Sequence, residues 1–344
     1  MTAVSAFELA TGTVVGSYRI LREIGHGGMG TVYECKHTVL PRRAAVKVMH
    51  ADLLRLPGMA TRVVQEATIL EDLRHPGLVR VFECNILPDR RPYIAMELVE
   101  GETLAERLRY GTVSPVELCG ILEHIADVLA AVHAQGVVHR DLKPDNIILT
   151  PPGDSYPLRV VDWGVARLDS VGRLTLEGLT PGTPIYMSPE QATGNGIGPA
   201  CDIYSLGVVA YEVLAGRPPF DGRTLVEVVC QHLAGEAQPL EEITSAPAEL
   251  CRLIHQMLDK DPSMRPGAIE IRQLARAMAQ NLESEYESYQ LDRREVVDAD
   301  VLECGNTERM PALPRPRWTP EIGQVPHAVA VADVARAAAN RRRG

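Results

Sequence analysis

Aromatic residues are scarce in this sequence, at 4% of 344 residues, so aliphatic side chains must supply most of its core. It has no apolar run near the roughly 18 residues that a membrane-spanning helix needs, and no secretory signal at its start. The seven cysteines are scattered without C-x-x-C spacing, which favours reduced, buried thiols over disulfides or a zinc site. Positive charge is not in excess either. The formal net charge of −10 argues against a broad nucleic-acid-binding face, and we expect a soluble cytoplasmic protein.

The apolar spacing changes along the chain and predicts an α+β protein with two lobes. Short β-like runs dominate up to about residue 100, interrupted by one helix-like stretch at about 60–73, and helical spacing dominates afterwards. We expect a small antiparallel β-rich N-lobe over 18–97, a joint at 97–101 and a larger, mainly helical C-lobe over 102–280. The predicted strands are 18–23, 31–35, 44–49, 78–84 and 93–98, and the predicted C-lobe helices include 116–133, 200–214 and 250–257.

The two ends of the chain have a different character. Residues 1–17 carry no strong periodic signal and are interpreted as a leader. Residues 281–344 are first acidic, then proline-rich, then rich in alanine and arginine. We expect this tail to be largely disordered, or ordered only against a partner.

Gly25, Gly27 and Gly30 form a G-x-G-x-x-G pattern, which is weak evidence by itself. A dinucleotide-binding fold would need these glycines to open a helix, but a strand-like run follows them. A P-loop is excluded because no G-K-[ST] follows. The pattern therefore favours a glycine-rich hairpin, which can lie flat over phosphates because no Cβ blocks the approach of its backbone.

Lys47 is the one charged side chain in the β-like run 44–48. Strand alternation places it with Ala45 on one face, opposite Ala44, Val46 and Val48. An edge-strand lysine is the competing interpretation. Glu66, however, falls on the apolar stripe of the predicted helix at 60–73, where an unpaired carboxylate is costly. We therefore predict a Lys47–Glu66 pair that holds the ammonium toward a phosphate.

The most specific pattern is His139–Asn146, a dense polar segment between two apolar runs. Asp141 can accept a proton from an attacking hydroxyl, Lys143 can neutralise a moving phosphoryl group, and Asn146 can supply a metal ligand. Asp162 ends the next β-like run, and a hairpin would return it beside Asn146. D-W-G alone is more often a turn, but two oxygen ligands plus phosphate oxygens suit Mg²⁺.

Residues 182–190 form a proline-punctuated segment that includes Glu190. An ordinary loop is the simpler interpretation of this segment. Arg265, in a second proline-flanked stretch, could form a buried pair with Glu190 and pin the loop, and we state this pair as a hypothesis.

In order and spacing, these motifs resemble those of the eukaryotic-like (Hanks-type) protein kinase family, and most of all its bacterial serine/threonine kinases. The resemblance covers about residues 18–278 and implies a bilobal protein-kinase-like fold. It also implies ATP as phosphoryl donor and Mg²⁺ as cofactor, with Mn²⁺ as an alternative. In such an enzyme Asp141 is the catalytic base, Asn146 and Asp162 hold the metal, and Lys47 holds the α- and β-phosphates and pairs with Glu66.

The nucleotide site follows from the same resemblance, with Met96 as gatekeeper and Glu97 to Val99 as the hinge that meets adenine. The residues implied to contact the nucleotide are Ile24, Gly25, Gly27, Gly28, Gly30, Val32, Ala45, Lys47, Met96, Glu97, Val99 and Ile148. Asp202 matches the family's aspartate that supports the backbone of the catalytic loop.

Serine/threonine preference is implied by Lys143, two residues after the base, and by Thr183, which the family uses to bridge the base and that lysine. Arg140 matches an arginine that commonly receives an activation-loop phosphate, and Thr175 and Thr180 are the candidate autophosphorylation sites.

Two departures are modest. Trp163 replaces the family's usual phenylalanine and is expected to pack against His139 and near Leu70. Ser188 replaces an alanine, which we expect to be neutral.

A pseudokinase scaffold is the main alternative, but it would be expected to lack Lys47, Asp141, Asn146 or Asp162, and none is missing. A small-molecule kinase is disfavoured by segment 182–190, which matches a protein-substrate loop. The expected partners are ATP and proteins bearing serine or threonine, without nucleic acid or a membrane anchor. Partner docking through the tail, and dimerisation for autophosphorylation in trans, are further hypotheses.

Overall fold

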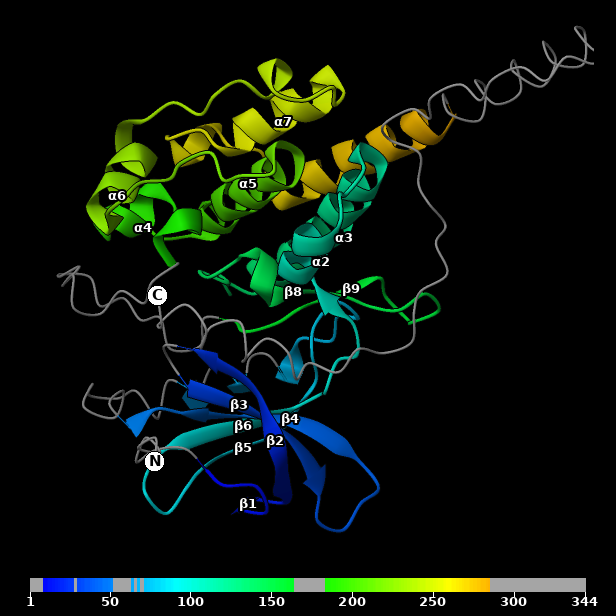
Figure 1. Ribbon diagram of the computed structural model, residues 1–344, viewed down its shortest axis with the longest axis vertical. Helices are drawn as coiled ribbons and strands as arrows, with labels where there is room; N and C mark the ends of the chain where they lie inside the picture. Colours follow the sequence, from blue (N-terminus) through cyan, green and yellow to red (C-terminus); the bar gives the residue numbers. More distant parts are fainter. Residues whose placement is uncertain are drawn as a thin grey trace, which may run out of the picture.

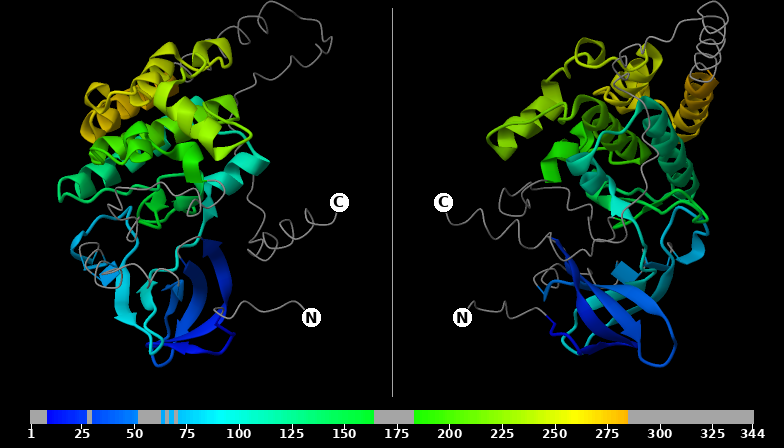
Figure 2. Two further views of the ribbon diagram at one scale, coloured as in Figure 1. Left: turned by 90° about the vertical axis from the view of Figure 1, so that its left-hand side faces the viewer. Right: turned by 45° about the vertical axis from the view of Figure 1, so that its right-hand side comes forward.

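The computed structural model describes residues 9–27, 30–51, 63–64, 67–68, 71–163 and 183–284. A sheet lobe and a helical lobe lie one above the other (Figure 1), and two further views show the same arrangement (Figure 2). The expected bilobal α+β architecture is therefore confirmed.

The sheet lobe is built on a six-stranded antiparallel sheet with the order β1-β2-β3-β4-β6-β5. Its strands are β1 (Val14–Val15), β2 (Tyr18–Gly27), β3 (Gly30–His37), β4 (Arg43–Met49), β5 (Val81–Ile86) and β6 (Pro92–Met96). Because β2 and β3 meet at Gly27 and Gly30, the glycine pattern lies in a hairpin, as the sequence predicts.

Two local expectations differ from the structure. Strand β1 lies inside the expected leader: it pairs with β2, and Val15 is fully buried. A two-residue strand is too short to show a period in the sequence, which is why it was missed. Strand β5 begins at Val81 and not at Leu78, because Leu78 instead forms a parallel bridge with Val160 of the helical lobe.

The two faces of β4 have different surroundings. Ala44, Val46 and Val48 lie in a small core on one face of the sheet, and Ala45 and Lys47 do not belong to that core. The predicted alternation is thus confirmed. In the predicted helix over 60–73, the described residues 63–64, 67–68 and 71–72 are helical, and Val63 and Ala67 are buried.

The helical lobe is built around two long helices, α3 (Pro115–His133) and α5 (Pro199–Ala215). Its other α-helices are α2 (Leu104–Tyr110), α4 (Pro189–Thr193), α6 (Leu225–Ala234), α7 (Ala248–Met257) and a helical stretch over 268–284. Short 3-10 helices are η2 (Pro144–Asn146), η3 (Thr183–Tyr186), η4 (Leu240–Glu242) and η5 (Pro262–Met264). Most of α5 is buried, so it forms the centre of the core.

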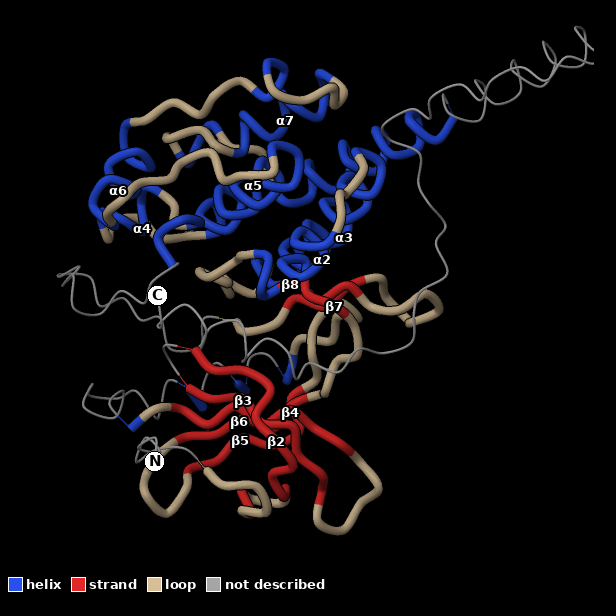
Figure 3. Tube along the Cα trace, viewed as in Figure 1, coloured by secondary structure: helices blue, strands red, loops and turns tan. Residues whose placement is uncertain are grey.

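A small three-stranded sheet lies on the side of the helical lobe that faces the large sheet (Figure 3). It contains β7 (Glu102–Thr103), β8 (Ile147–Leu149) and β9 (Leu158–Val160). Gly101 connects the lobes with φ 148°, and a Cβ there would meet the carbonyl oxygen of Leu149. Glycine is thus required at the predicted joint. In the described residues, no helix is long and apolar enough to cross a membrane, and the six cysteines are free.

Candidate active site

The backbone of the polar loop at 139–146 is held by Asp202, which lies near the start of α5 and is fully buried. One carboxylate oxygen accepts the backbone N–H of His139 at 2.8 Å and contacts His133 Nε2 at 2.8 Å. The other accepts the backbone N–H of Arg140 at 2.8 Å. Arg140 has a left-handed φ of 64°, which is uncommon for a bulky residue and needs such support.

His139 connects this loop to the strand that precedes Asp162. Its ring is fully buried; Nδ1 lies 3.2 Å from the Asp141 backbone N–H, and Nε2 lies 3.1 Å from the Val161 carbonyl oxygen. A neutral ring with its proton on Nε2 satisfies both contacts. Burial lowers the pKa of His139 despite the nearby carboxylates of Asp202 and Asp141, which supports the neutral form.

The predicted base, lysine and metal ligands are brought together. Lys143 Nζ lies 3.5 Å from a carboxylate oxygen of Asp141. The side-chain amide of Asn146 donates to the Asp141 carbonyl oxygen at 2.8 Å, and the Val161 N–H donates to the Asn146 carbonyl oxygen at 2.9 Å. Because Val161 directly precedes Asp162, this second contact places Asp162 close to Asn146, as the predicted hairpin requires.

Lys47 reaches from β4 across to Asp162 and forms an ion pair with its carboxylate. This contact joins the two lobes at the site. Desolvation would raise the pKa of Asp162, but the Lys47 ammonium, together with His139 and Lys143, outweighs it, so the pKa lies below its usual value. Glu66, the predicted partner of Lys47, lies outside the described residues.

The strand register gathers the expected nucleotide residues on one face of the large sheet. Val32 pairs with Lys47, and Ala45 pairs with Met96. Directly paired residues share a face, and so do residues two apart, so these four side chains share the face opposite the small core. Ile148, on β8 of the other lobe, pairs with Thr103 of β7 close to the joint, and its role toward adenine stays a prediction.

The hinge begins at Glu97, directly after β6. Its backbone N–H donates to the Arg80 carbonyl oxygen at 2.8 Å, and its carboxylate lies 3.4 Å from Arg80 Nε. Val99 lies in the segment between β6 and β7, and Ile24 lies beside an irregularity in the β2–β3 register. Their roles toward adenine stay predictions.

The glycines of the hairpin are not equivalent. A Cβ at Gly30 would meet the backbone of β4 at Val48, so the sheet itself requires this glycine. A Cβ at Gly25 or Gly27 would find its nearest neighbour at 3.9 Å, so packing does not demand glycine there. A ligand that approaches the backbone would explain both. Gly28 lies outside the described residues.

The oxygen ligands that Asn146 and Asp162 can offer fit the chemistry of Mg²⁺. The described residues contain no group of three His, Cys, Asp or Glu side chains that could hold a metal. Mg²⁺ needs only one or two protein oxygens beside phosphates and water. The Asn146 side-chain NH₂ is used by the Asp141 carbonyl oxygen, which leaves its amide oxygen for a cation.

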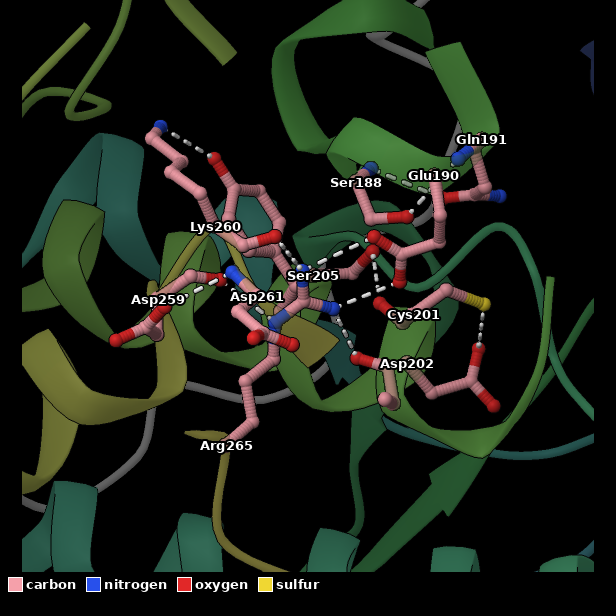
Figure 4. Close-up of polar contacts among 12 residues, drawn as sticks. Ser188, Glu190, Gln191, Cys201, Asp202, Ser205, Asp259, Lys260, Asp261 and Arg265 are labelled. Carbon is pink, nitrogen blue, oxygen red and sulfur yellow. Dashed lines mark hydrogen bonds and ion pairs between the residues drawn. The ribbon is translucent and has the colours of Figure 1, made fainter. Parts of the chain in front are cut away.

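The hypothesised Glu190–Arg265 pair is confirmed. Both side chains are buried, and the guanidinium makes two hydrogen bonds to the carboxylate, at 2.7 and 3.0 Å (Figure 4). Arg265 also donates to the Ala200 carbonyl oxygen at 2.8 Å. The pair therefore fixes α4 against the start of α5.

Thr183 begins η3, next to the segment 164–182, which holds Thr175 and Thr180 and lies outside the described residues.

Sequence reasoning missed several side-chain contacts near the site. Ser188 caps α4, and Gln191 closes the reciprocal capping box, a role that the S-x-x-Q spacing signals. Trp163 packs on the His139 ring at 4.5 Å, as expected, but its indole N–H also donates to the Val160 carbonyl oxygen at 3.0 Å. A phenylalanine could not make that hydrogen bond. Leu70 lies outside the described residues.

A lysine–aspartate pair joins the sheet lobe to the helical lobe, beside a loop that carries the predicted base and one metal-ligand candidate, Asn146. The second candidate, Asp162, is the aspartate of that pair. This arrangement defines a protein-kinase-like fold. The family model described as "Protein kinase domain" matches residues 18–275. The chain belongs to this family.

Several curated bacterial proteins are similar to this chain. It is 38% identical over 270 residues to serine/threonine-protein kinase pkn2 of Myxococcus xanthus, which covers 77% of this chain and 32% of that protein. It is 38% identical over 258 residues to serine/threonine-protein kinase PknA of Mycobacterium tuberculosis, which covers 74% of this chain and 59% of that protein. The chain thus spans between a third and three-fifths of these relatives.

A solved structure, the PknI kinase domain of Mycobacterium tuberculosis, has a TM-score of 0.62 and 26% identity. The match covers 79% of this chain and 99% of that domain. The fold expected from the motifs is therefore supported independently by a known structure.

We predict that Arg265→Ala lowers the free energy of unfolding by about 3–5 kcal/mol, because it leaves the Glu190 carboxylate buried without its partner. Arg252→Ala is the matched control: Arg252 lies 4.0 Å from Glu249, both side chains are exposed, and its loss should cost less than about 1 kcal/mol. Urea denaturation monitored by circular dichroism measures both. Equal losses in the two variants would contradict a structural role for the buried pair.

Proposed function

We propose that this chain is a serine/threonine protein kinase that transfers the γ-phosphoryl group of ATP to hydroxyl groups of proteins. The observation that carries the proposal is the convergence of Lys47, Asp141, Lys143, Asn146 and Asp162 from three separate segments of the chain: β4, the loop 139–146 and the residues after β9. Membership of the protein kinase family, and the printed names of the curated relatives, support the same function.

In this proposal Asp141 accepts the proton of the attacking hydroxyl and orients it toward the phosphorus. Lys143, 3.5 Å from Asp141, lies where it can neutralise charge that develops on the transferred group. Lys47 presents its ammonium from β4 to the α- and β-phosphates. Asn146 and Asp162 would hold Mg²⁺, or Mn²⁺, which would supply further charge neutralisation at the phosphate oxygens.

The preference for serine and threonine rests on Lys143 and on Thr183, the proposed bridge between base and lysine. We further propose that the kinase phosphorylates its own activation loop, at Thr175 or Thr180. The phosphate would be received by Arg140, whose backbone is already held by Asp202. Docking of partners through residues 281–344, and dimerisation for phosphorylation in trans, belong to the same proposal.

We predict that Asp141→Asn and Lys47→Met each lower phosphotransfer to a generic basic protein by at least about 100-fold, because proton acceptance or phosphate charge neutralisation is lost. Both variants should still unfold cooperatively. Lys36→Met, at an exposed position of β3, is the matched control and should keep the wild-type rate. Wild-type activity in Asp141→Asn would contradict the assignment of the base, and an inactive wild-type chain would favour a pseudokinase.

We predict that incubation with Mg²⁺ and ATP adds phosphate between residues 162 and 190, at Thr175 or Thr180. Mass spectrometry of proteolytic peptides locates the modification. The Asp141→Asn protein, incubated alone, serves as the control and should carry none. Phosphate found only outside this segment would count against activation-loop autophosphorylation.

A further inference from the structure

Gln191 lies in the first turn of α4, next to Glu190, and its side chain makes two different hydrogen bonds. Its Oε1 accepts the backbone N–H of Ser188 at 3.0 Å, which is one half of the capping box. Its Nε2 donates to the backbone carbonyl oxygen of Arg140 at 2.8 Å. The capping box needs only the first of these bonds, so the second calls for its own explanation.

The peptide group between Arg140 and Asp141 is held at both ends. Its carbonyl oxygen accepts from Gln191 Nε2, and its N–H donates to His139 Nδ1 at 3.2 Å. A peptide group is planar and rigid, so two hydrogen bonds on opposite edges fix its rotation. That rotation sets the direction in which the Asp141 side chain leaves the backbone.

Arg140 itself needs such restraint. Its φ of 64° is strained for a residue with a long side chain, and the strain persists only where neighbours over-determine the conformation. Asp202 holds its N–H, and Gln191 holds its carbonyl group. Without the Gln191 contact, only one side of the residue stays restrained by these side chains.

Helix α4, from which Gln191 makes this contact, is itself held in place by a buried ion pair. Glu190, the neighbour of Gln191, is buried and bonded twice to Arg265 (Figure 4). Adjacent residues of one short helix therefore point to different parts of the lobe, Glu190 to Arg265 and Gln191 to the catalytic loop. The side chain of Gln191 therefore connects α4, which the Glu190–Arg265 pair holds in place, to the backbone directly before Asp141.

We propose that Gln191 is a positioning residue for the catalytic base: its side-chain NH₂ fixes the 140–141 peptide and so orients Asp141. The inference rests on the proposed kinase function. It concerns the orientation of the base and not its chemistry, so loss of Gln191 should lower kcat and leave nucleotide binding intact.

Gln191→Glu is the sharpest test, because it keeps an oxygen for the Ser188 N–H and replaces only the donor that faces the Arg140 carbonyl group. We expect kcat to fall by about 10–100-fold, the KM for ATP to change by less than about twofold, and the unfolding midpoint to stay close to that of the wild type. Ser188→Ala is the matched control. It removes the hydroxyl that caps the Gln191 backbone N–H, leaves the Nε2 donor in place, and should keep kcat near the wild-type value.

The outcomes are distinct. Wild-type kcat in Gln191→Glu overturns the inference, and so does an equal fall of kcat in Ser188→Ala, since the cap alone would then explain the effect. If Gln191→Glu does not fold, Gln191→Met, an uncharged side chain of similar length, replaces it, and a wild-type kcat there overturns the inference equally. A wild-type protein without phosphotransfer activity would instead refute the proposed function.

Discussion

The buried carboxylate of Asp202 is the constraint on which the site depends. A carboxylate with no exposure to solvent must be satisfied by protein donors, and here those donors include the backbone N–H groups of the two residues directly before Asp141. Because Asp202 belongs to α5, which is largely buried, formation of the core of the helical lobe also sets the path of the catalytic loop. Fold stability and active-site geometry are therefore coupled at this residue.

Further polar contacts connect the catalytic loop to both lobes. Within the helical lobe, the Glu190–Arg265 pair holds α4 in place, and Gln191 connects α4 to the catalytic loop through the Arg140 carbonyl oxygen. Toward the sheet lobe, the Lys47–Asp162 ion pair crosses from β4, and His139 links the backbone of Asp141 to that of Val161. The groups proposed to act on the phosphate are thus held by a continuous set of polar contacts in both lobes.

Local patterns in the sequence predicted much of this arrangement. The alternation around Lys47 correctly predicted its face of the sheet, and the two proline-flanked segments that hold Glu190 and Arg265 correctly suggested a pair. Contacts set by distant segments were harder to foresee: Leu78 bridges to Val160 in the other lobe, and β1 is too short to show a period. The contact from Gln191 to Arg140 was also not predicted. The S-x-x-Q spacing indicates a capping box, which uses the amide oxygen of Gln191, but it does not show where the amide nitrogen donates.

The most direct test of the central claim is the kcat of Asp202→Asn, measured together with its unfolding midpoint. An asparagine has nearly the same size but turns one acceptor into a donor that faces a backbone N–H. If Asp202 sets the catalytic loop, kcat should fall by at least about 100-fold in protein that still unfolds cooperatively. A folded Asp202→Asn protein with wild-type kcat would contradict the account.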